Sequence, residues 1–127
     1  MVITQVIQEV TTDFNQSLAS LVKDVRPDDL TPKSFLGLLE GLKVVVHEAG
    51  LKAFVGIVSA LEEPVEVVEH GGKRHRFKRS SEKEWLTPFG VARIRRRYYQ
   101  PDVGGQGVVP LDVRCGMVGR FATPDVE

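Results

Sequence analysis

The pattern of apolar residues changes period at Pro64, and this change limits the chain to an α+β fold. Before Pro64, apolar residues recur three or four positions apart, which places them on one face of a helix. After Pro64, apolar and polar residues alternate, as they do in a strand with one buried face. We therefore expect a helical region over residues 1–63, followed by a small antiparallel sheet of two β-hairpins over residues 64–127.

Two helices are expected in the first region. The first covers Thr12–Val25, where apolar residues follow helical spacing. The second begins at Thr31-Pro32, because Thr caps a helix and Pro suits the first helical position. Gly50 is expected to break or kink this second helix, and Pro64 is expected to end it.

Two turns predict the hairpins. Gly71-Gly72 is a two-residue hairpin signal, and Pro88-Phe89-Gly90 is a second tight turn. Between the hairpins, Ser80–Lys83 is expected to form a polar loop. Residues 112–127 are so weakly patterned that we expect a frayed tail. The expected strands are residues 65–69, 73–79, 85–87 and 91–99.

Charge is segregated along a chain that is neutral overall. Residues 73–97 contain ten Lys and Arg against two acids, which is a net charge of +8. Residues 1–72 contain five bases and eleven acids, net −6, and residues 98–127 contain two bases and four acids, net −2. A local positive field of this kind favours binding to a polyanion.

Alternation places basic side chains on one face of each hairpin. A charged two-stranded ribbon can follow the phosphates of duplex DNA or enter a groove. The competing interpretation is the solvated outer face of a half-buried sheet. The residues predicted to contact DNA are Arg74, Arg76, Lys78, Arg79, Arg93, Arg95, Arg96, Arg97 and Tyr99.

Two tyrosines follow the arginine cluster. Tyr98 shares its face with Ile94, so we expect it in the core. Tyr99 then faces outward, where it can stack on a base or hydrogen-bond a phosphate. A register slip of one residue would exchange the two faces.

No catalytic or metal-binding motif is apparent. His70 and His75 flank the Gly71-Gly72 turn and Cys115 is the single cysteine, but zinc needs a fourth ligand and a recognisable spacing. His47 is expected at the helix surface. We therefore predict no metal, no cofactor, no catalytic residue and no small-molecule substrate.

The sequence also predicts a location. The N-terminus lacks a basic lead followed by an apolar core, so no signal peptide is expected. Apolar runs in the helical region are interrupted by residues such as Glu48 and Lys52, so no membrane span is expected. A single cysteine excludes an internal disulfide and suits a reducing compartment. The expected location is the cytoplasm.

Five short blocks together resemble bacterial insertion-sequence transposases of the Kra type. They occur in the order Thr87-Pro-Phe-Gly90, Arg97-Tyr-Tyr-Gln100, Gly104-Gly105, Val109-Pro-Leu-Asp112 and Ala122-Thr-Pro124. The resemblance covers residues 65–127 best. Many members carry a Cys-x-x-Cys pair after the two tyrosines; here Pro101 and Gly104 stand in those places, as in members that have a Gly-Gly loop instead.

The resemblance implies a DNA-associated N-terminal region that precedes a catalytic domain of the ribonuclease-H type. That domain holds two metal ions with two Asp and one Glu. This chain stops at Glu127, about where the family continues into that domain. The expectation is a truncated transposase-like protein that binds double-stranded DNA and has no strand-transfer activity of its own.

A different function class remains open. The helices of residues 12–63 can form a homo-oligomer or a partner surface, while the basic strands bind an acidic protein or the acidic half of the same chain. A third interpretation is a remnant of a mobile element without a selected function. Oligomeric state and DNA affinity together distinguish these hypotheses.

Overall fold

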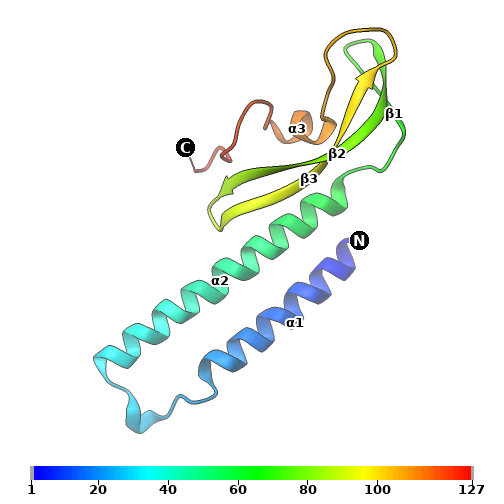
Figure 1. Cartoon of the computed structure of the whole chain (residues 1–127). Helices are drawn as coiled ribbons and strands as arrows, with labels where there is room; N and C mark the ends of the chain where they lie inside the picture. Colours follow the sequence, from blue (N-terminus) through cyan, green and yellow to red (C-terminus); the bar gives the residue numbers. More distant parts are fainter. Residues whose placement is uncertain (1, 127) are drawn as a thin grey trace. The chain divides into compact units, whose positions relative to one another are not determined.

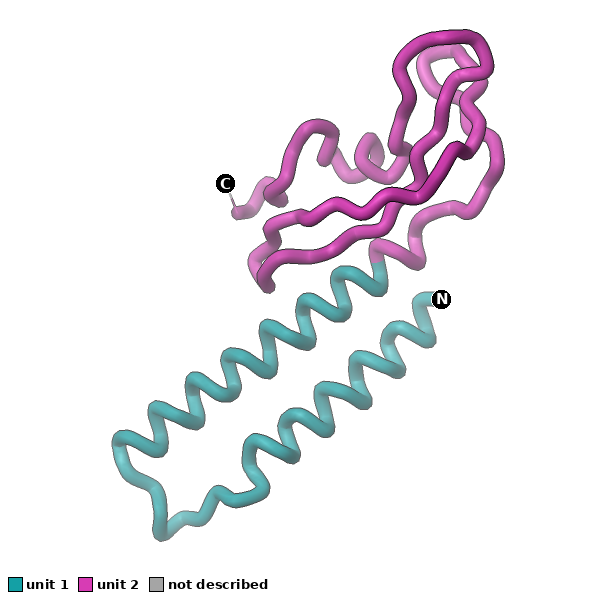
Figure 2. The backbone as a smooth tube through the Cα atoms, viewed as in Figure 1, with its two compact units in different colours: residues 1–57 teal, residues 58–127 magenta. Residues whose placement is uncertain are grey.

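The computed structural model describes residues 2–126 and has the expected α+β order, helices first and an antiparallel sheet second (Figure 1). The chain divides into two compact units, residues 1–57 and residues 58–127 (Figure 2). The last turn of the second helix therefore belongs to the sheet unit. The elements are α1 (Ile3–Val22), a 3₁₀ turn (Pro27–Asp29), α2 (Pro32–Leu61), β1 (Val67–His70), β2 (Lys73–Thr87), β3 (Gly90–Pro101) and α3 (Pro110–Cys115).

In the first unit, α1 and α2 form an antiparallel helical pair (Figure 1). Two glycines of α2 leave room for side chains of α1. A Cβ atom on Gly41 would lie 2.5 Å from Cδ1 of Leu21, and one on Gly56 would lie 2.6 Å from Cγ1 of Val6. Glycine at these positions therefore lets Leu21 and Val6 pack against the backbone of α2.

The helix limits differ from expectation in two places. α1 begins at Ile3 rather than Thr12, because Val6, which is buried, packs against α2 and stabilises the earlier turns. α2 continues through Gly50 without a break, since one interior glycine costs only about 1 kcal/mol. The expected start is confirmed: the Ser34 amide donates to Oγ1 of Thr31 at 3.1 Å.

By length and composition, α2 could cross a membrane, with a mean hydropathy of 1.6 over an 18-residue window. Charged residues interrupt the apolar runs of α2 but leave its mean hydropathy high. The expectation that no segment spans a membrane stays a prediction, because length and composition alone do not test it. The core helix of a soluble protein passes the same test, so this finding alone does not assign a membrane.

The sheet has three antiparallel strands in the order β1-β2-β3. The Gly71-Gly72 turn is confirmed, and both glycines have the positive φ values, 58° and 75°, that this turn requires. The expected loop at Ser80–Lys83 is wrong, because β2 is one continuous strand of 15 residues. These polar residues pair with β3, and Glu82 lies opposite Arg95, where opposite charges stabilise the pairing. The two predicted hairpins thus share their middle strand.

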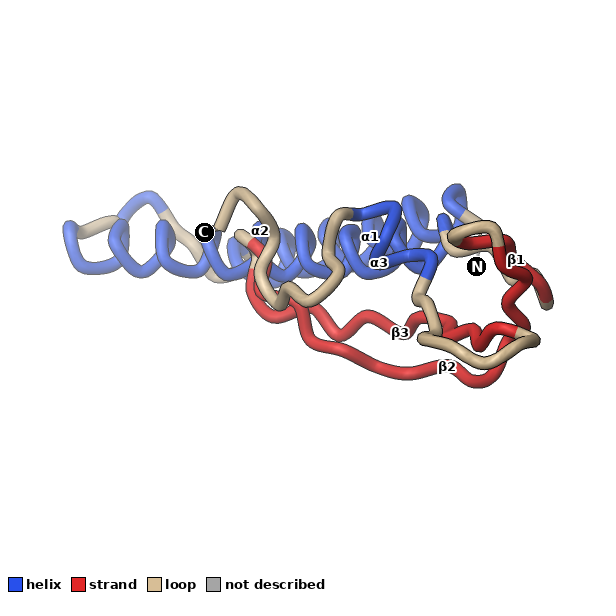
Figure 3. The backbone as a smooth tube through the Cα atoms, turned by 90° about the horizontal axis from the view of Figure 1, so that it is seen from above, coloured by secondary structure: helices blue, strands red, loops and turns tan. Residues whose placement is uncertain are grey.

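The β2–β3 pairing contains an irregularity at Lys78. Phe77 lies opposite Tyr99 and Arg79 lies opposite Tyr98, so Lys78 is an extra residue in β2, as in a β-bulge. After the bulge, the side chains of β2 alternate in the opposite sense. Figure 3 shows the two long strands running side by side.

The core of the second unit includes Trp85, Ile94 and Tyr99, each exposed by 1% or less. The C-terminal segment also contributes, so the expected frayed tail is wrong. Met117 and Ala122 are buried, and Phe121 and Thr123 hydrogen-bond the backbone of Leu86. Burial of the Met117 and Ala122 side chains and backbone pairing to Leu86 of β2 order a segment that has no clear periodicity of its own.

Candidate nucleic-acid interface

The basic residues of β2 and β3 lie on two opposite faces of the ribbon. Residues that are direct partners across an antiparallel pair share a face. Arg76 is the partner of Gln100, whereas Arg93 is the partner of Glu84. Since Gln100 and Arg93 are an odd number of positions apart on β3, they point to opposite faces. The basic faces predicted for the two hairpins therefore do not combine into one surface, because the strand register places Arg76 and Arg93 on opposite sides of the sheet.

One cluster lies where β2 leaves the Gly71-Gly72 turn, and we call it the basic end. It consists of five exposed residues of β2: Lys73, Arg74, Arg76, Lys78 and Arg79. Lys73 was missed by the sequence prediction. The signal that could have found it was its position as the first residue of the same basic run.

The acids nearest the basic end neutralise it only partly. Nε of Arg76 lies 2.8 Å from Oδ1 of Asp102, and Nε of Arg74 lies 3.9 Å from Oδ2 of the same carboxylate. The side chains of Arg76 and Arg74 remain 59% and 60% exposed. Glu69 is the cross-strand partner of Arg74. Exposed ion pairs of this kind are worth about 0–1 kcal/mol and are readily exchanged for a stronger anion.

The two tyrosines have exchanged the positions expected from the sequence. Tyr99 is only 1% exposed, and its hydroxyl donates a hydrogen bond to the carbonyl of Val65. Tyr98 is half-buried, and the guanidinium of Arg79 lies 4.6 Å from its ring centroid. Tyr99 thus belongs to the core, and Tyr98 borders the basic end. The residues after α2 cover Tyr99, which strand alternation alone does not reveal.

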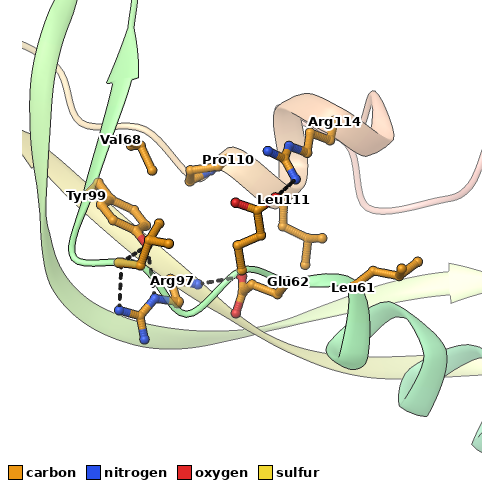
Figure 4. A pocket seen from close by; sticks show the side chains of 10 residues that line it. Leu61, Glu62, Val68, Arg97, Tyr99, Pro110, Leu111 and Arg114 are labelled. Atoms are coloured by element: carbon orange, nitrogen blue, oxygen red, sulfur yellow. Dashed lines mark hydrogen bonds and ion pairs between the residues drawn. The ribbon is translucent and has the colours of Figure 1, made fainter. Parts of the chain in front are cut away.

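The side chain of Arg97 is also engaged in contacts within the protein (Figure 4). Its guanidinium donates to the carbonyl of Val65 and to the hydroxyl of Tyr99, both at 3.0 Å, and lies 3.8 Å from the ring centroid of Phe77. Its backbone amide donates to Oε2 of Glu62 at 3.0 Å. The side chain is only 17% exposed. Arg97 therefore ties the segment after α2 to the outer edge of β3.

Arg96 forms a largely buried ion pair with Asp112 of α3. The two side chains are 14% and 9% exposed. Among the described residues, Nε of Arg96 and Oδ1 of Asp112 have no hydrogen-bond partner. A charge held in this way is compensated by its partner rather than by water. Arg96 is thus positioned to hold α3 against the sheet.

The remaining arginines of β3 face acids. Nη2 of Arg93 lies 3.7 Å from Oε1 of Glu84, and Arg95 is the cross-strand partner of Glu82. Two arginines and two glutamates on adjacent strands carry no net charge. This part of the ribbon therefore attracts a polyanion much less than the basic end does.

A small cavity lies beside Arg97 and Tyr99, and Glu62, Leu111 and Arg114 also line it (Figure 4). Its volume is ≈ 30 Å³. A space of this size holds about one water molecule and is far smaller than a ligand pocket.

His70 and His75 make an edge-to-face ring contact, with centroids 5.9 Å apart. Nδ1 of His75 lies 3.0 Å from the carbonyl oxygen of Lys73, so the ring hydrogen-bonds the backbone next to the Gly71-Gly72 turn. Within residues 2–126, no group of three or more His, Cys, Asp or Glu side chains is placed to hold a metal ion.

Cys115, at the end of α3, should react slowly with thiol reagents. Cys115 is exposed, but partial burial of the sulfur, and then the negative charge of Asp112, raise the pKa of its thiol. A raised pKa means less thiolate at about pH 8, and the thiolate is the reactive form. We expect labelling several-fold slower than in the same protein unfolded in guanidinium chloride. Equal rates in both states would contradict the expectation.

No protein-family model, no curated protein and no solved structure matches this chain.

Proposed function

We propose that this chain is the DNA-binding part of a transposase-like protein, and that the basic end contacts duplex DNA. The observation that carries the proposal is the exposure of five basic side chains on seven consecutive residues, against which, within residues 2–126, only the acids Glu69 and Asp102 are paired. Such a cluster supplies the phosphate contacts that dominate affinity for DNA. The order of the motifs from Thr87 to Pro124 supports the transposase-like part of the proposal.

The cluster presents its cations from the middle strand of the sheet, where Arg76 lies between Val67 of β1 and Gln100 of β3. Arg74, Arg76 and Arg79 share one face of the sheet, because Arg76 and Arg79 lie opposite Gln100 and Tyr98, two positions apart on β3, and Arg74 lies two positions before Arg76 on β2. A row of cations on one face can follow the phosphates of a duplex. On binding, phosphates would replace Asp102 as the partner of the two arginines. These contacts position the protein, and base recognition falls to one or two arginines that reach guanine edges.

We propose binding without strand transfer for these residues. Strand transfer by two metal ions needs a set of carboxylates converging on the metals. The basic end offers cations instead, and cations bind DNA without activating water or a hydroxyl group. A catalytic contribution would have to come from other residues or another chain.

The salt dependence of binding tests the proposal. If the basic end neutralises four or five phosphates, the log–log plot of affinity against salt should have a slope of about −4. Fluorescence anisotropy of a labelled duplex at several salt concentrations measures this slope. A slope near zero, or no binding at low salt by folded protein, would overturn the proposal and favour an acidic protein as the partner of the basic end.

A further inference from the structure

The helical pair of residues 3–57 has an apolar side that the unit itself leaves uncovered. On α2, the residues that lie beside α1 are Gly41 and Gly56, together with Lys52, whose Nζ lies 3.0 Å from Oδ2 of Asp13. Val45, which is buried, lies on the same side of α2. These residues mark the side of α2 that faces α1. Successive residues of a helix are about 100° apart around its axis. On this basis, a second set of apolar residues on α2 lies about 90° around the axis from the side that faces α1.

We call this second set the apolar stripe. On α1 it begins with Ile3 and Ile7, and the half-buried Phe14 and Leu18 continue it at helical spacing. Six of its exposed members are between 39% and 56% exposed. They are Ile3, Ile7, Phe35, Leu39, Leu42 and Val46.

The stripe forms one continuous side of the helical pair. Viewed from the N-terminus of each helix, the stripe lies clockwise from the side that contacts the other helix. Because α1 and α2 run in opposite directions, a clockwise displacement on each helix places the α1 part and the α2 part of the stripe on the same side of the pair (Figure 1). The stripe positions of the described helices contain no Asp, Glu, Lys or Arg.

We propose that the apolar stripe is covered by the same stripe of a second copy of this chain, which forms a four-helix bundle. Two antiparallel helices bury one row of apolar residues between them. In a four-helix bundle, each helix also carries a second apolar row at helical spacing, which packs against the other pair of helices. A two-fold axis brings the same patch of both copies together, so a patch without charge complements itself. Six half-exposed side chains offer on the order of 500 Å² per chain, or about 1,000 Å² over both copies, which is the size at which a specific interface begins.

A lipid bilayer fits these residues less well. A membrane surrounds a spanning helix on every side, whereas α2 carries charged residues on the sides away from the stripe, beside the exposed Leu36 and Val44. Glu40 and Glu48 are exposed elsewhere on α2, and the Lys52–Asp13 pair is about half exposed. Charges near the middle of a span are costly in hydrocarbon. A protein partner covers the stripe and leaves these charges in water.

Val44 and Val46 supply a matched pair of variants. Both are exposed, by 56% and 45%, and two positions on a helix are about 200° apart. Only Val46 belongs to the stripe. Glutamate at position 46 would bring one carboxylate from each copy into the apolar interface, whereas glutamate at position 44 would stay in water.

The test is the mass of the full chain by light scattering and by sedimentation equilibrium. We expect the wild type and Val44→Glu to form a dimer of 28.2 kDa, twice the monomer mass of 14.1 kDa. Val46→Glu should weaken dimerisation by about 100-fold or more and sediment as a monomer. Circular dichroism checks that each variant keeps its helices, and the milder Val46→Ser replaces Val46→Glu if that variant unfolds.

Two results would overturn the proposal. One is a wild-type monomer at tens of micromolar protein. The other is a dimer that Val44→Glu dissociates and Val46→Glu does not. A monomer that floats with phosphatidylcholine–phosphatidylglycerol vesicles would assign the stripe to a bilayer instead. The measurement needs no DNA, so its outcome is independent of the proposed DNA binding.

Discussion

Replacing Arg96 with alanine should lower the free energy of unfolding of the sheet unit by about 3–5 kcal/mol. The carboxylate of Asp112 is 9% exposed and has the Arg96 guanidinium as its ion-pair partner. Removal of the arginine leaves a buried negative charge without a counterion. The α3 segment, which also carries Leu111, should then separate from the sheet. Urea denaturation followed by the fluorescence of Trp85, the single tryptophan, measures the change.

A neighbouring arginine provides the control. Arg95 is exposed and pairs across the strands with Glu82, so Arg95→Ala should change stability by no more than about 0.5 kcal/mol. The double variant Arg96→Met/Asp112→Leu removes both charges and should recover most of the lost stability. If Arg96→Ala and Arg95→Ala are equally stable, the ion pair does not hold α3 as inferred.

Removal of three cations from the basic end should nearly abolish DNA binding. For Arg74→Ala/Arg76→Ala/Lys78→Ala we expect about 100-fold weaker binding at low salt and a log–log salt slope reduced by about 3. The physical reason is the loss of about three phosphate contacts and of the counterions that they release. These side chains are exposed, and their ion pairs with Asp102 are weak, so the fold should be kept. Fluorescence anisotropy with one labelled duplex measures both quantities.

The comparison variant is Arg93→Ala/Arg95→Ala, on the opposite face of the ribbon. The charges of these two arginines are balanced by Glu84 and Glu82, so we expect less than about a fivefold loss of affinity. A larger loss in this variant than in the triple variant would move the DNA contact to β3. Equal small losses in both would argue against any contact through the sheet.

Local sequence signals predicted several features of the fold correctly. The helix start at Thr31-Pro32 depends on a hydrogen bond between residues three apart, and the Gly71-Gly72 turn depends on positive φ at two adjacent residues. Both need only neighbours in the chain. The change of period at Pro64 predicted the α+β class for the same reason.

Other features depend on residues far apart in sequence. The hydroxyl of Tyr99 is held by Val65, 34 residues earlier, and Arg96 is paired with Asp112, 16 residues later. The alternation of apolar and polar residues along β3 does not predict that Tyr99 or Arg96 is buried by these distant segments. The bulge at Lys78 likewise appears only when β2 and β3 are aligned, and the strand alignment decides which arginines share a face. The tail was mispredicted because its order comes from contacts with Leu86 and the core.

The sequence alone determined the α+β order, the two turns that form the sheet, and the net charge of +8 over residues 73–97, because these follow from local conformational preference and composition. Only the tertiary structure decided how that charge is distributed. Burial and ion pairing occupy Arg96 and Arg97, opposing glutamates balance Arg93 and Arg95, and strand register leaves the basic end exposed. The physical reason is that a charge acts on a ligand only where the fold neither neutralises it nor removes it from solvent.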